Sequence, residues 1–458
     1  MIYLLIISGS GFVKIGVVGV GYVGLITGVC LSYIGHKVVC YDVDEEKIEK
    51  LNNDQPPIFE KGLVDMMINV KKKIKYTTDK ELAFHNIDVI FLAVGTPEDD
   101  KGLPNLSYIY QACYDIVKNI DNDCVVVIKS TVPVGTSEQI EKYFKANTTY
   151  KINVVSNPEF LSQGNAINDT LHAERIIIGC NNLKDIQIMK KLYMPLLKPP
   201  YNIPFIVTDR NSAEMIKYAC NGFLALKISY INEIANLCKK NGANIEYVTK
   251  GMGYDNRIGK EFLKAGIGYG GSCFPKDTKA LYEIAKYKNI ELKTIKACMD
   301  VNEKQRCILF DEMVNNLKEL KNKTIAILGV TFKPRTDDVR CSPAIENVKL
   351  LLKKGAIVNV YDPIGIANFK KCIKHKNLFY YENILKAIEN CEAMLIITDW
   401  EDIKLLPIQT IIAKMKVPRI YDGRNCFSLE EIAKEKVYYS SIGRRTINNI
   451  HEIERKSD

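Results

Sequence analysis

The sequence predicts an α/β chain with two doubly wound, parallel sheets separated by a helical middle section. Short runs rich in Val and Ile recur through the N-terminal part, a long stretch with few chain breakers follows, and similar runs return in the C-terminal part. Continuous apolar runs that alternate with helix-length segments are typical of a parallel sheet covered on both faces. A length of 458 residues is sufficient for two or three domains.

The N-terminal part contains the first set of predicted strands. These are Lys14–Gly19, Lys37–Asp42, Asp88–Val94, Cys124–Lys129, Ile152–Ser156 and Arg175–Gly179. Helix-length segments separate the runs, and parallel neighbours need crossover connections of this kind. We therefore expect these strands to form one parallel sheet.

The middle section begins with a long helix, predicted over Ser212–Lys240, in which Gly222 is the only Gly or Pro. At 1.5 Å per residue this helix would extend roughly 40 Å, enough to join two domains or to form the core of a dimer. Further helices are expected to about Leu320. The apolar side of the long helix is marked by Ile216, Phe223, Ile231 and Ile234.

The C-terminal part returns to the strand pattern. The strands predicted there are Lys323–Gly329, Ala356–Tyr361, Ala393–Thr398 and Pro418–Tyr421. Two α/β units on either side of a helical section predict domains at residues 13–208, 209–318 and 319–450.

Composition narrows the class of protein. The formal charge of +9 is spread along the chain, and the densest basic run is Lys71–Lys73, so a small anionic ligand explains the excess better than nucleic acid. The 14 cysteines include no CxxC pair, which favours reduced thiols and a cytoplasmic location. The five histidines are scattered, so no metal site is expected.

The chain ends are treated separately from the fold. The apolar segment Met1–Phe12 is too short to span a bilayer and lacks the basic start of a signal peptide. We expect translation to begin at Val13 instead. The charged tail Ile450–Asp458 is expected to be mobile. No other segment is long and apolar enough to be transmembrane, so no membrane partner is expected.

A dinucleotide-binding fingerprint opens the first sheet. The segment Gly19–Gly24 reads GVGYVG, follows a predicted strand and begins a helix. Such glycines allow a tight turn and let a pyrophosphate approach the helix N-terminus. Asp42 ends the next strand, where a carboxylate binds ribose hydroxyls and repels a 2′-phosphate. The sequence therefore predicts NAD as cofactor, and not NADP.

Three further strand ends carry polar residues. Thr96 and Thr131 lie in turns after the third and fourth predicted strands, and Glu159 follows the fifth. Ligands of a doubly wound sheet bind beyond the carboxyl ends of its strands, so the threonines are candidates to contact the nicotinamide and Glu159 to act as a general base. Ordinary proline turns are the alternative interpretation for both threonine segments.

The middle section contains the candidate nucleophile. Cys273 ends the glycine-rich stretch GIGYGGSC, and Asp277 follows four residues later. A reachable thiolate can form a covalent intermediate, although a structural cysteine in a glycine-rich turn is the alternative. Lys217 and Asn221 are four residues apart and share one helix face. Together they could stabilise an oxyanion, although such a pair is usually just solvated.

The second α/β unit lacks a GxGxxG motif but is rich in cations after its first strand. The turn after that strand contains Lys333, Arg335 and Arg340, and a later strand ends near Arg424. Arginine and lysine side chains around a turn suit phosphate groups, so this unit is expected to bind a phosphorylated ligand.

These motifs resemble the UDP-glucose/GDP-mannose dehydrogenase family. The resemblance covers about residues 14–445 and rests on GVGYVG, KSTVPVGT, NPEF, the helix SAEMIKYACNGFLALKISYINEIANLC, GYGGSCFPKD and GVTFKPRTDDVR. It implies two Rossmann-like domains joined by a central helical dimerisation domain. It also implies a homodimer or higher oligomer that oxidises UDP-glucose to UDP-glucuronate with two NAD⁺ and one water.

The resemblance assigns a role to each candidate. Cys273 would be the nucleophile that forms a thiohemiacetal and then a thioester, Asp277 would work as acid and base with a water, and Glu159 would serve the thioester steps. Catalytic roles also fall to Lys217, Asn221 and Thr131. The implied cofactor contacts are Gly19, Val20, Gly21, Tyr22, Val23, Gly24, Asp42, Lys47, Thr96, Thr131, Glu159, Lys276 and Arg340. The implied substrate contacts are Phe160, Leu161, Lys217, Asn221, Arg257, Phe262, Leu263, Gly270, Lys333 and Arg424, with Arg257 reaching the partner's substrate.

One departure from the family pattern bears on the activity. The family often reads NPEFLREG, whereas Ser162 and Gln163 stand here, so the second acidic position is neutral. This change could slow thioester hydrolysis. The alternatives are a GDP-mannose or UDP-N-acetylhexosamine 6-dehydrogenase, and a non-catalytic regulator that binds NAD and a nucleotide sugar.

Overall fold

The computed structural model describes residues 13–450. Residues 1–12 and 451–458 lie outside the described part. The predicted translation start at Val13 directly follows the first of these segments, and most of the tail that was predicted to be mobile lies in the second. The chain divides into two compact units, one that ends at Ala219 and one that begins at Cys220. The three predicted domains stay a prediction.

Within residues 13–219 the strands form one eight-stranded sheet in the order β3-β2-β1-β4-β5-β6-β7-β8. The strands are β1 (Lys14–Val18), β2 (Lys37–Tyr41), β3 (Ile74–Thr77), β4 (Val89–Leu92), β5 (Cys124–Ile128), β6 (Ile152–Ser156), β7 (Ile176–Gly179) and β8 (Phe205–Thr208). The first six strands pair in parallel in the order of a dinucleotide-binding sheet, which confirms the predicted fold class.

The expectation that all the predicted strands run parallel is wrong at β7. β7 pairs antiparallel with β6 through Ser156 and Gly179. The segment between these strands contains only the short helix α7 (Ala166–Leu171). Its remaining residues form a turn that returns the chain along the same edge, where a parallel crossover would need a longer covering helix.

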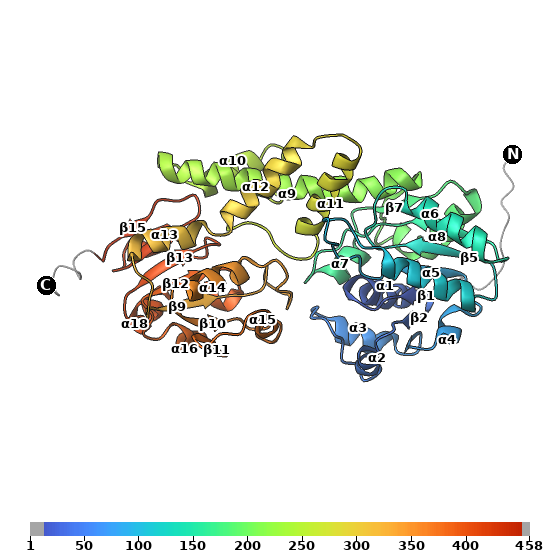
Figure 1. Cartoon of the computed structure of the whole chain (residues 1–458), viewed down its shortest axis with the longest axis horizontal. Helices are drawn as coiled ribbons and strands as arrows, with labels where there is room; N and C mark the ends of the chain where they lie inside the picture. The colour runs from blue at the N-terminus through green and yellow to red at the C-terminus, as the bar shows by residue number, and fades with distance from the viewer. Residues whose placement is uncertain (1–12, 451–458) are drawn as a thin grey trace. The chain divides into compact units, whose positions relative to one another are not determined.

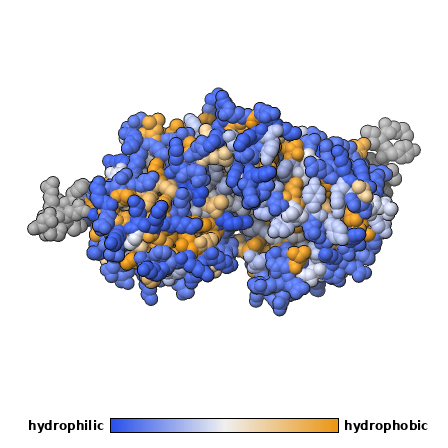
Figure 2. Space-filling view, in the orientation of Figure 1, coloured by the Kyte–Doolittle hydropathy of each residue, from blue (hydrophilic) through white to orange (hydrophobic). Residues whose placement is uncertain are grey.

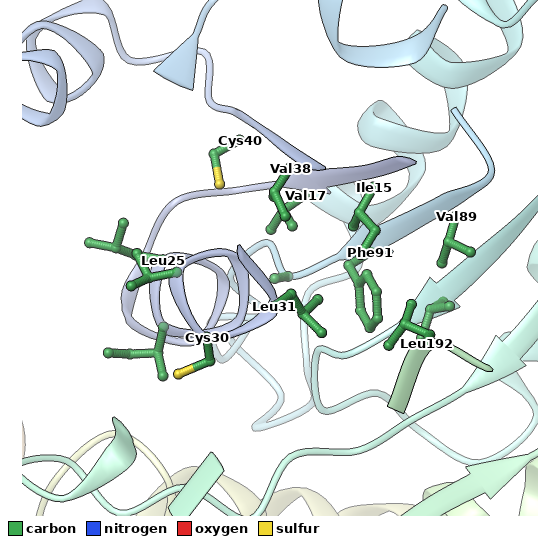
Figure 3. Packing of buried hydrophobic residues seen from close by; sticks show 14 of the residues in the cluster. Ile15, Val17, Leu25, Cys30, Leu31, Val38, Cys40, Val89, Phe91 and Leu192 are labelled. Atoms are coloured by element: carbon green, nitrogen blue, oxygen red, sulfur yellow. The ribbon is translucent and has the colours of Figure 1, made fainter. Parts of the chain in front are cut away.

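Helices pack against this sheet (Figure 1), and its apolar side chains are buried. α1 packs on β2 and against α3 and α7. Figure 3 shows Leu31, Phe91 and Leu192 among the side chains of this core. The helices are α1 (Tyr22–Tyr33), α2 (Glu45–Asn52), α3 (Leu63–Val70), α4 (Lys80–Phe84), α5 (Ser107–Asn119), α6 (Thr136–Asn147), α7 and α8 (Leu183–Leu197).

Within residues 220–450 the strands form a seven-stranded sheet that repeats the same order, β11-β10-β9-β12-β13-β14, before β15. All pairs are parallel except the pair of β14 and β15. The strands are β9 (Thr324–Leu328), β10 (Ile357–Tyr361), β11 (Leu378–Tyr381), β12 (Ala393–Ile396), β13 (Arg419–Asp422), β14 (Tyr438–Ser441) and β15 (Ile447–Asn448). Its helices are α14 (Pro343–Lys353), α15 (Ile366–Cys372), α16 (Ile384–Ile388), α17 (Glu401–Lys404), α18 (Ile408–Lys414) and α19 (Leu429–Ile432).

The predicted long helix is confirmed as α9 (Arg210–Asn241), which contains 32 residues. Four further helices follow it before the second sheet. They are α10 (Ile245–Gly253), α11 (Phe274–Tyr287), α12 (Lys293–Gln305) and α13 (Ile308–Leu317). No helix within residues 13–450 is long and apolar enough to cross a membrane. The face drawn in Figure 2 is mostly hydrophilic, with smaller hydrophobic areas between the polar side chains.

Candidate active site

The glycine fingerprint has the geometry that a bound pyrophosphate requires. Gly19 turns the chain after β1 with φ of +91°. A side chain at Gly24 would lie 1.8 Å from the Gly19 carbonyl oxygen, so helix and strand can pack this closely only with glycine there. A side chain at Gly21 would enter open space, which is the space that a phosphate at the N-terminus of α1 would fill.

Asp42 lies beside this turn, as predicted for the ribose-binding carboxylate. Its Oδ2 accepts a hydrogen bond of 2.8 Å from the backbone N–H of Val20, and Lys47 Nζ lies 3.1 Å from the same oxygen. The corresponding position of the second sheet is Asp362, which is buried and bonded to Val330, Thr331 and Trp400 among others.

The two aspartates differ in the hydrogen-bond donors that surround their carboxylates. Asp362 Oδ2 accepts from the Trp400 indole across 3.0 Å, and Oδ1 accepts from the Gly365 N–H across 2.6 Å. More protein donors surround the Asp362 carboxylate than surround Asp42, which accepts from Val20 and Lys47 at Oδ2 and from Asp44 at Oδ1. Asp42 thus keeps more acceptor capacity than Asp362, and its contact with the ribose of a dinucleotide stays a prediction.

The turns after β4 and β5 meet at the edge of the first sheet. Thr96 Oγ1 donates to the carbonyl oxygen of Thr131 across 2.9 Å, and Ser130 Oγ donates to the carbonyl oxygen of Val94 across 2.6 Å. The two threonines singled out from the sequence are thus brought together beyond the strand ends. The simple proline-turn interpretation does not require this contact.

Glu159 is held in a buried ion pair. Its Oε1 lies 2.9 Å from Lys217 Nζ on α9, and its Oε2 accepts from the Leu161 N–H across 2.5 Å. Both charged side chains are buried. Burial alone would raise the pKa of Glu159, but Lys217 and the nearby Lys129 outweigh it, and the pKa is lowered. Glu159 is therefore ionised, as a general base must be.

The aromatic ring of Phe160 lies between cations beside this pair. The Arg175 guanidinium is 4.4 Å from the ring centroid and the Lys217 ammonium 5.4 Å from it. Cation–π contacts of this kind orient the ring and reduce the desolvation cost of the charges. Phe160 thereby helps to fix the position of Lys217.

A connection that the sequence gave no sign of lies next to the fingerprint. Glu60 is buried, accepts a hydrogen bond from the Tyr22 hydroxyl, and accepts from the N–H groups of Gly164 and Ala166, each across 2.8 Å. The Gly164 N–H also donates to the Tyr22 oxygen across 2.9 Å. The segment that follows Glu159 is thereby tied to the first residue of α1.

A second buried polar cluster lies in the C-terminal unit. Asn221 Nδ2 on α9 donates to Asp277 Oδ2 on α11 across 2.6 Å, and Lys276 Nζ lies 2.7 Å from Asp277 Oδ1. Asn221 and Asp277 are both buried. The contact of Asn221 with Asp277 joins two residues predicted for the site. Lys276 bonds the same aspartate, and its predicted contact with the cofactor stays a prediction.

Cys273 is the N-cap residue of α11 and is partly buried. The Arg340 guanidinium interacts electrostatically with its thiol and is itself held by Asp338 at 2.6 Å, which raises the pKa of Arg340. Cys273 thus lies where a helix begins and within electrostatic reach of a guanidinium.

The glycines before Cys273 allow two loops to pack closely. A side chain at Gly270 would lie 2.3 Å from the carbonyl oxygen of Cys341, and one at Gly271 would meet the ring of Phe332 at 2.9 Å. The Gly271 N–H also donates to the carbonyl oxygen of Arg340 across 2.9 Å. The cysteine loop is thus fixed on the cation-rich loop that follows β9.

The predicted substrate contacts have different surroundings. Leu263 is buried in the apolar core, and Phe262 is partly exposed with φ of +62° and its ring against Phe274. Arg424 is enclosed, and its Nε donates to the carbonyl oxygen of Ile397 across 2.7 Å. Burial lowers the pKa of Arg424. The predicted contact of Arg424 with a substrate stays a prediction.

Two more predicted cations are placed as follows. Arg257 is exposed and lies 2.6 Å from Asp255 Oδ2, and Lys333 Nζ lies 5.7 Å from the ring centroid of Phe332. Their roles toward a substrate stay a prediction. Among residues 13–450, no group of three His, Cys, Asp or Glu side chains is arranged to hold a metal ion.

Comparison with known families defines the class of protein to which this fold and site belong. Residues 13–197 match the NAD binding domain of the UDP-glucose/GDP-mannose dehydrogenase family, residues 211–304 its central domain and residues 326–429 its UDP binding domain. The chain belongs to the UDP-glucose/GDP-mannose dehydrogenase family. NAD is therefore its cofactor and a nucleotide sugar its class of substrate.

Individual relatives narrow the comparison. The chain is 44% identical to the UDP-glucose 6-dehydrogenase TuaD of Bacillus subtilis, over 95% of this chain and 94% of that protein. It is 42% identical to a UDP-glucose 6-dehydrogenase of Rickettsia felis, over 93% of this chain and 95% of that protein. Among solved structures it is similar to a UDP-glucose dehydrogenase of Pyrobaculum islandicum, with a TM-score of 0.88, 32% identity, and coverage of 96% and 100%.

Proposed function

We propose that this protein is a UDP-glucose 6-dehydrogenase, which converts UDP-glucose, two NAD⁺ and water to UDP-glucuronate and two NADH. One observation carries the proposal. Helix α9 bears Lys217, paired with Glu159, and four residues further Asn221, bonded to Asp277. A cation, an amide donor and two carboxylates are the groups that a covalent aldehyde oxidation needs around its nucleophile.

The chain's own residues divide the work as follows. Bound NAD accepts the hydride of each oxidation. Asp277, through a water, takes the proton of the sugar C6 hydroxyl when the aldehyde forms. The Cys273 thiolate then adds to that aldehyde, and Lys217 and Asn221 donate to the oxyanion of the thiohemiacetal. A covalent aldehyde cannot diffuse away between the two oxidations.

Hydrolysis completes the reaction. The second oxidation converts the thiohemiacetal to a thioester, and a water must then attack its carbonyl carbon. Glu159 accepts the proton of that water because its carboxylate is held ionised by Lys217. The thiolate of Cys273 leaves, and UDP-glucuronate is released. Gln163, four residues after Glu159, is an amide that cannot act as a second base.

The proposed active form is a homodimer assembled through α9. Phe223, Tyr230 and Leu237 recur every seven residues on this helix, with 61%, 49% and 56% of their surface exposed. Seven residues are close to two helical turns, so the three side chains form one exposed apolar stripe. A second copy of α9 offers the same stripe and would cover it.

We place the enzyme in the cytoplasm because its buried cysteines, such as Cys30 and Cys40, are free thiols.

The deciding experiment measures NADH formed per nucleotide sugar at limiting sugar, with UDP-glucose, GDP-mannose and UDP-N-acetylmannosamine in parallel. Two NADH from UDP-glucose alone support the proposal. Two NADH from another sugar would reassign the substrate within the family. A burst of about one turnover that stalls would indicate slow thioester hydrolysis and implicate Gln163. No NADH from any sugar would favour a regulator that only binds these ligands.

A further inference from the structure

Lys129 is an ionisable group that the mechanism above does not use. It directly follows β5, is partly buried, and lines a cavity of about 60 Å³ together with Asn157, Glu159 and Tyr193. Its Nζ donates to Asn157 Oδ1 across 3.1 Å. A lysine in such a place has a cost, because an ammonium group removed from water needs compensating partners.

Asn157 connects Lys129 to the segment that carries Glu159. Its Oδ1 also accepts from the Tyr193 hydroxyl across 2.6 Å, and its Nδ2 donates to the carbonyl oxygen of Ile177 across 2.8 Å. The side chain of Asn157 is therefore fixed from β5, β7 and α8 at once. Glu159 lies two residues further along the same segment, so its position depends on this anchor.

The charges around Lys129 come from several elements. Burial lowers the pKa of Lys129 to about 8, Glu159 opposes that change, and Lys217 on α9 adds to it. Asp169 on α7 and Arg175 before β7 line the same cavity. In return, Lys129 contributes with Lys217 to the lowered pKa of Glu159. Two cations thus act on one carboxylate, and only one of them is paired with it directly.

We propose that Lys129 is a positioning residue for Glu159: it anchors Asn157 and places a second cation in the cavity that Glu159 also lines. The inference rests on the proposed role of Glu159 in thioester hydrolysis. A lysine that only filled the end of β5 would be replaceable by a neutral side chain without any change in the pH dependence of the reaction.

The test is the pH dependence of kcat in four matched proteins. Lys129→Gln keeps a donor for Asn157 but removes the charge, and we expect the acidic limb of kcat to move about one pH unit upward, with the KM for NAD changed less than about twofold. Tyr193→Phe removes the other donor to Asn157 Oδ1, and its limb should coincide with that of the unmodified enzyme. Lys129→Arg keeps the charge and should restore the original limb.

Two further variants, Asn157→Asp and Glu159→Gln, cover a Lys129→Gln protein that does not fold and a failure of the role proposed for Glu159. If Lys129→Gln does not fold, Asn157→Asp places a compensating carboxylate beside Lys129, and the limb should again move upward. A folded Lys129→Gln or Asn157→Asp enzyme whose limb matches that of the unmodified protein overturns the inference. Glu159→Gln separates the two proposals, because an acidic limb that persists in this variant refutes the role of Glu159 itself, independently of Lys129.

Discussion

Glu60 and Gly164 are 104 residues apart in the chain, yet a hydrogen bond of 2.8 Å joins the Glu60 carboxylate to the Gly164 N–H. The same carboxylate accepts from Tyr22, the first residue of the helix behind the glycine fingerprint. Glu60 therefore links the cofactor turn to the segment that carries Glu159. A substitution of Glu60 should therefore alter both the cofactor turn and the segment that carries Glu159.

The first prediction concerns Glu60→Gln. The Gly164 and Ala166 N–H groups bond different oxygens of Glu60, and glutamine has only one oxygen, so its amide N–H₂ would face one of these two donors. We expect the free energy of unfolding to fall by about 2–3 kcal/mol and the KM for NAD to rise. Urea denaturation and steady-state kinetics measure these quantities. Glu45→Gln, an exposed position, should stay within about 0.5 kcal/mol, and equal losses in both variants would contradict the prediction.

The sequence predicted the central strands well and the edge strands poorly. β1, β2 and β9 are continuous apolar runs because neighbours cover them on both sides. The edge strands β3, β8, β11 and β15 were missed because edge strands have one neighbour and tolerate polar or exposed residues, as in the IKYT of β3. β14 was also missed, although it lies between β13 and β15, because its sequence YYSS is not an apolar run. Periodicity detects burial, and edge strands have less of it.

At the candidate site, the sequence predicted individual residues but not the contacts between them. Helical spacing placed Lys217 and Asn221 on one face, but it could not reveal that Lys217 pairs with Glu159 and Asn221 with Asp277. Lys129 was read only as the end of a strand, and Glu60 carried no motif at all. Contacts between distant segments have no local signal, so only the folded chain shows them.

The second prediction tests the nucleophile. In Cys273→Ser the hydroxyl stays protonated at neutral pH, so no thioester forms. We expect UDP-glucuronate formation to fall at least about a thousandfold while NAD still binds with unchanged affinity. Product analysis and fluorescence titration of NAD measure both. Cys372→Ser, at an exposed cysteine on α15, is the matched control and should keep full activity. Normal double oxidation by Cys273→Ser would refute the covalent mechanism.

The third prediction concerns cofactor choice. Asp42→Asn keeps the acceptor for the Val20 N–H but removes the charge that repels a 2′-phosphate. We expect the KM for NAD to rise about tenfold and kcat/KM for NADP to increase. Asp44→Asn, two residues away and exposed, should leave both cofactors unchanged. If Asp42→Asn alters the kinetics with NAD and NADP in the same direction, Asp42 does not discriminate between them.

The fourth prediction tests the apolar stripe on α9. Tyr230→Arg puts a charge at its centre, and burial of an unpaired charge in a symmetric interface is repeated in both copies. We expect the dimer dissociation constant to rise at least about thirtyfold, measured by light scattering over a dilution series. Tyr287→Arg, at a residue of α11 that is 62% exposed, should not change the mass. A Tyr230→Arg protein that stays dimeric at the same concentrations would place the interface elsewhere.

The last prediction follows from His36, which is buried and neutral. Its Nδ1 accepts from the Val13 N–H across 3.3 Å, and its Nε2 donates to the carbonyl oxygen of Leu192 across 2.8 Å. Burial lowers the pKa of His36, and the charges of Lys191 and Lys73 lower it further. Protonation would also remove the acceptor for Val13, so the folded state resists it.

Below about pH 6.5 the unfolded chain binds a proton at His36 that the folded chain does not, so the stabilisation is present above that pH and is lost as the pH falls. We expect unfolding free energy to decrease between pH 6.5 and 5 with a slope from this residue that approaches about 1.4 kcal/mol per pH unit. His36→Gln should have a shallower slope in urea denaturation over this range. His85→Gln, at an exposed histidine, should keep the slope of the unmodified protein, and identical slopes in all three proteins would show that His36 is not the group that titrates.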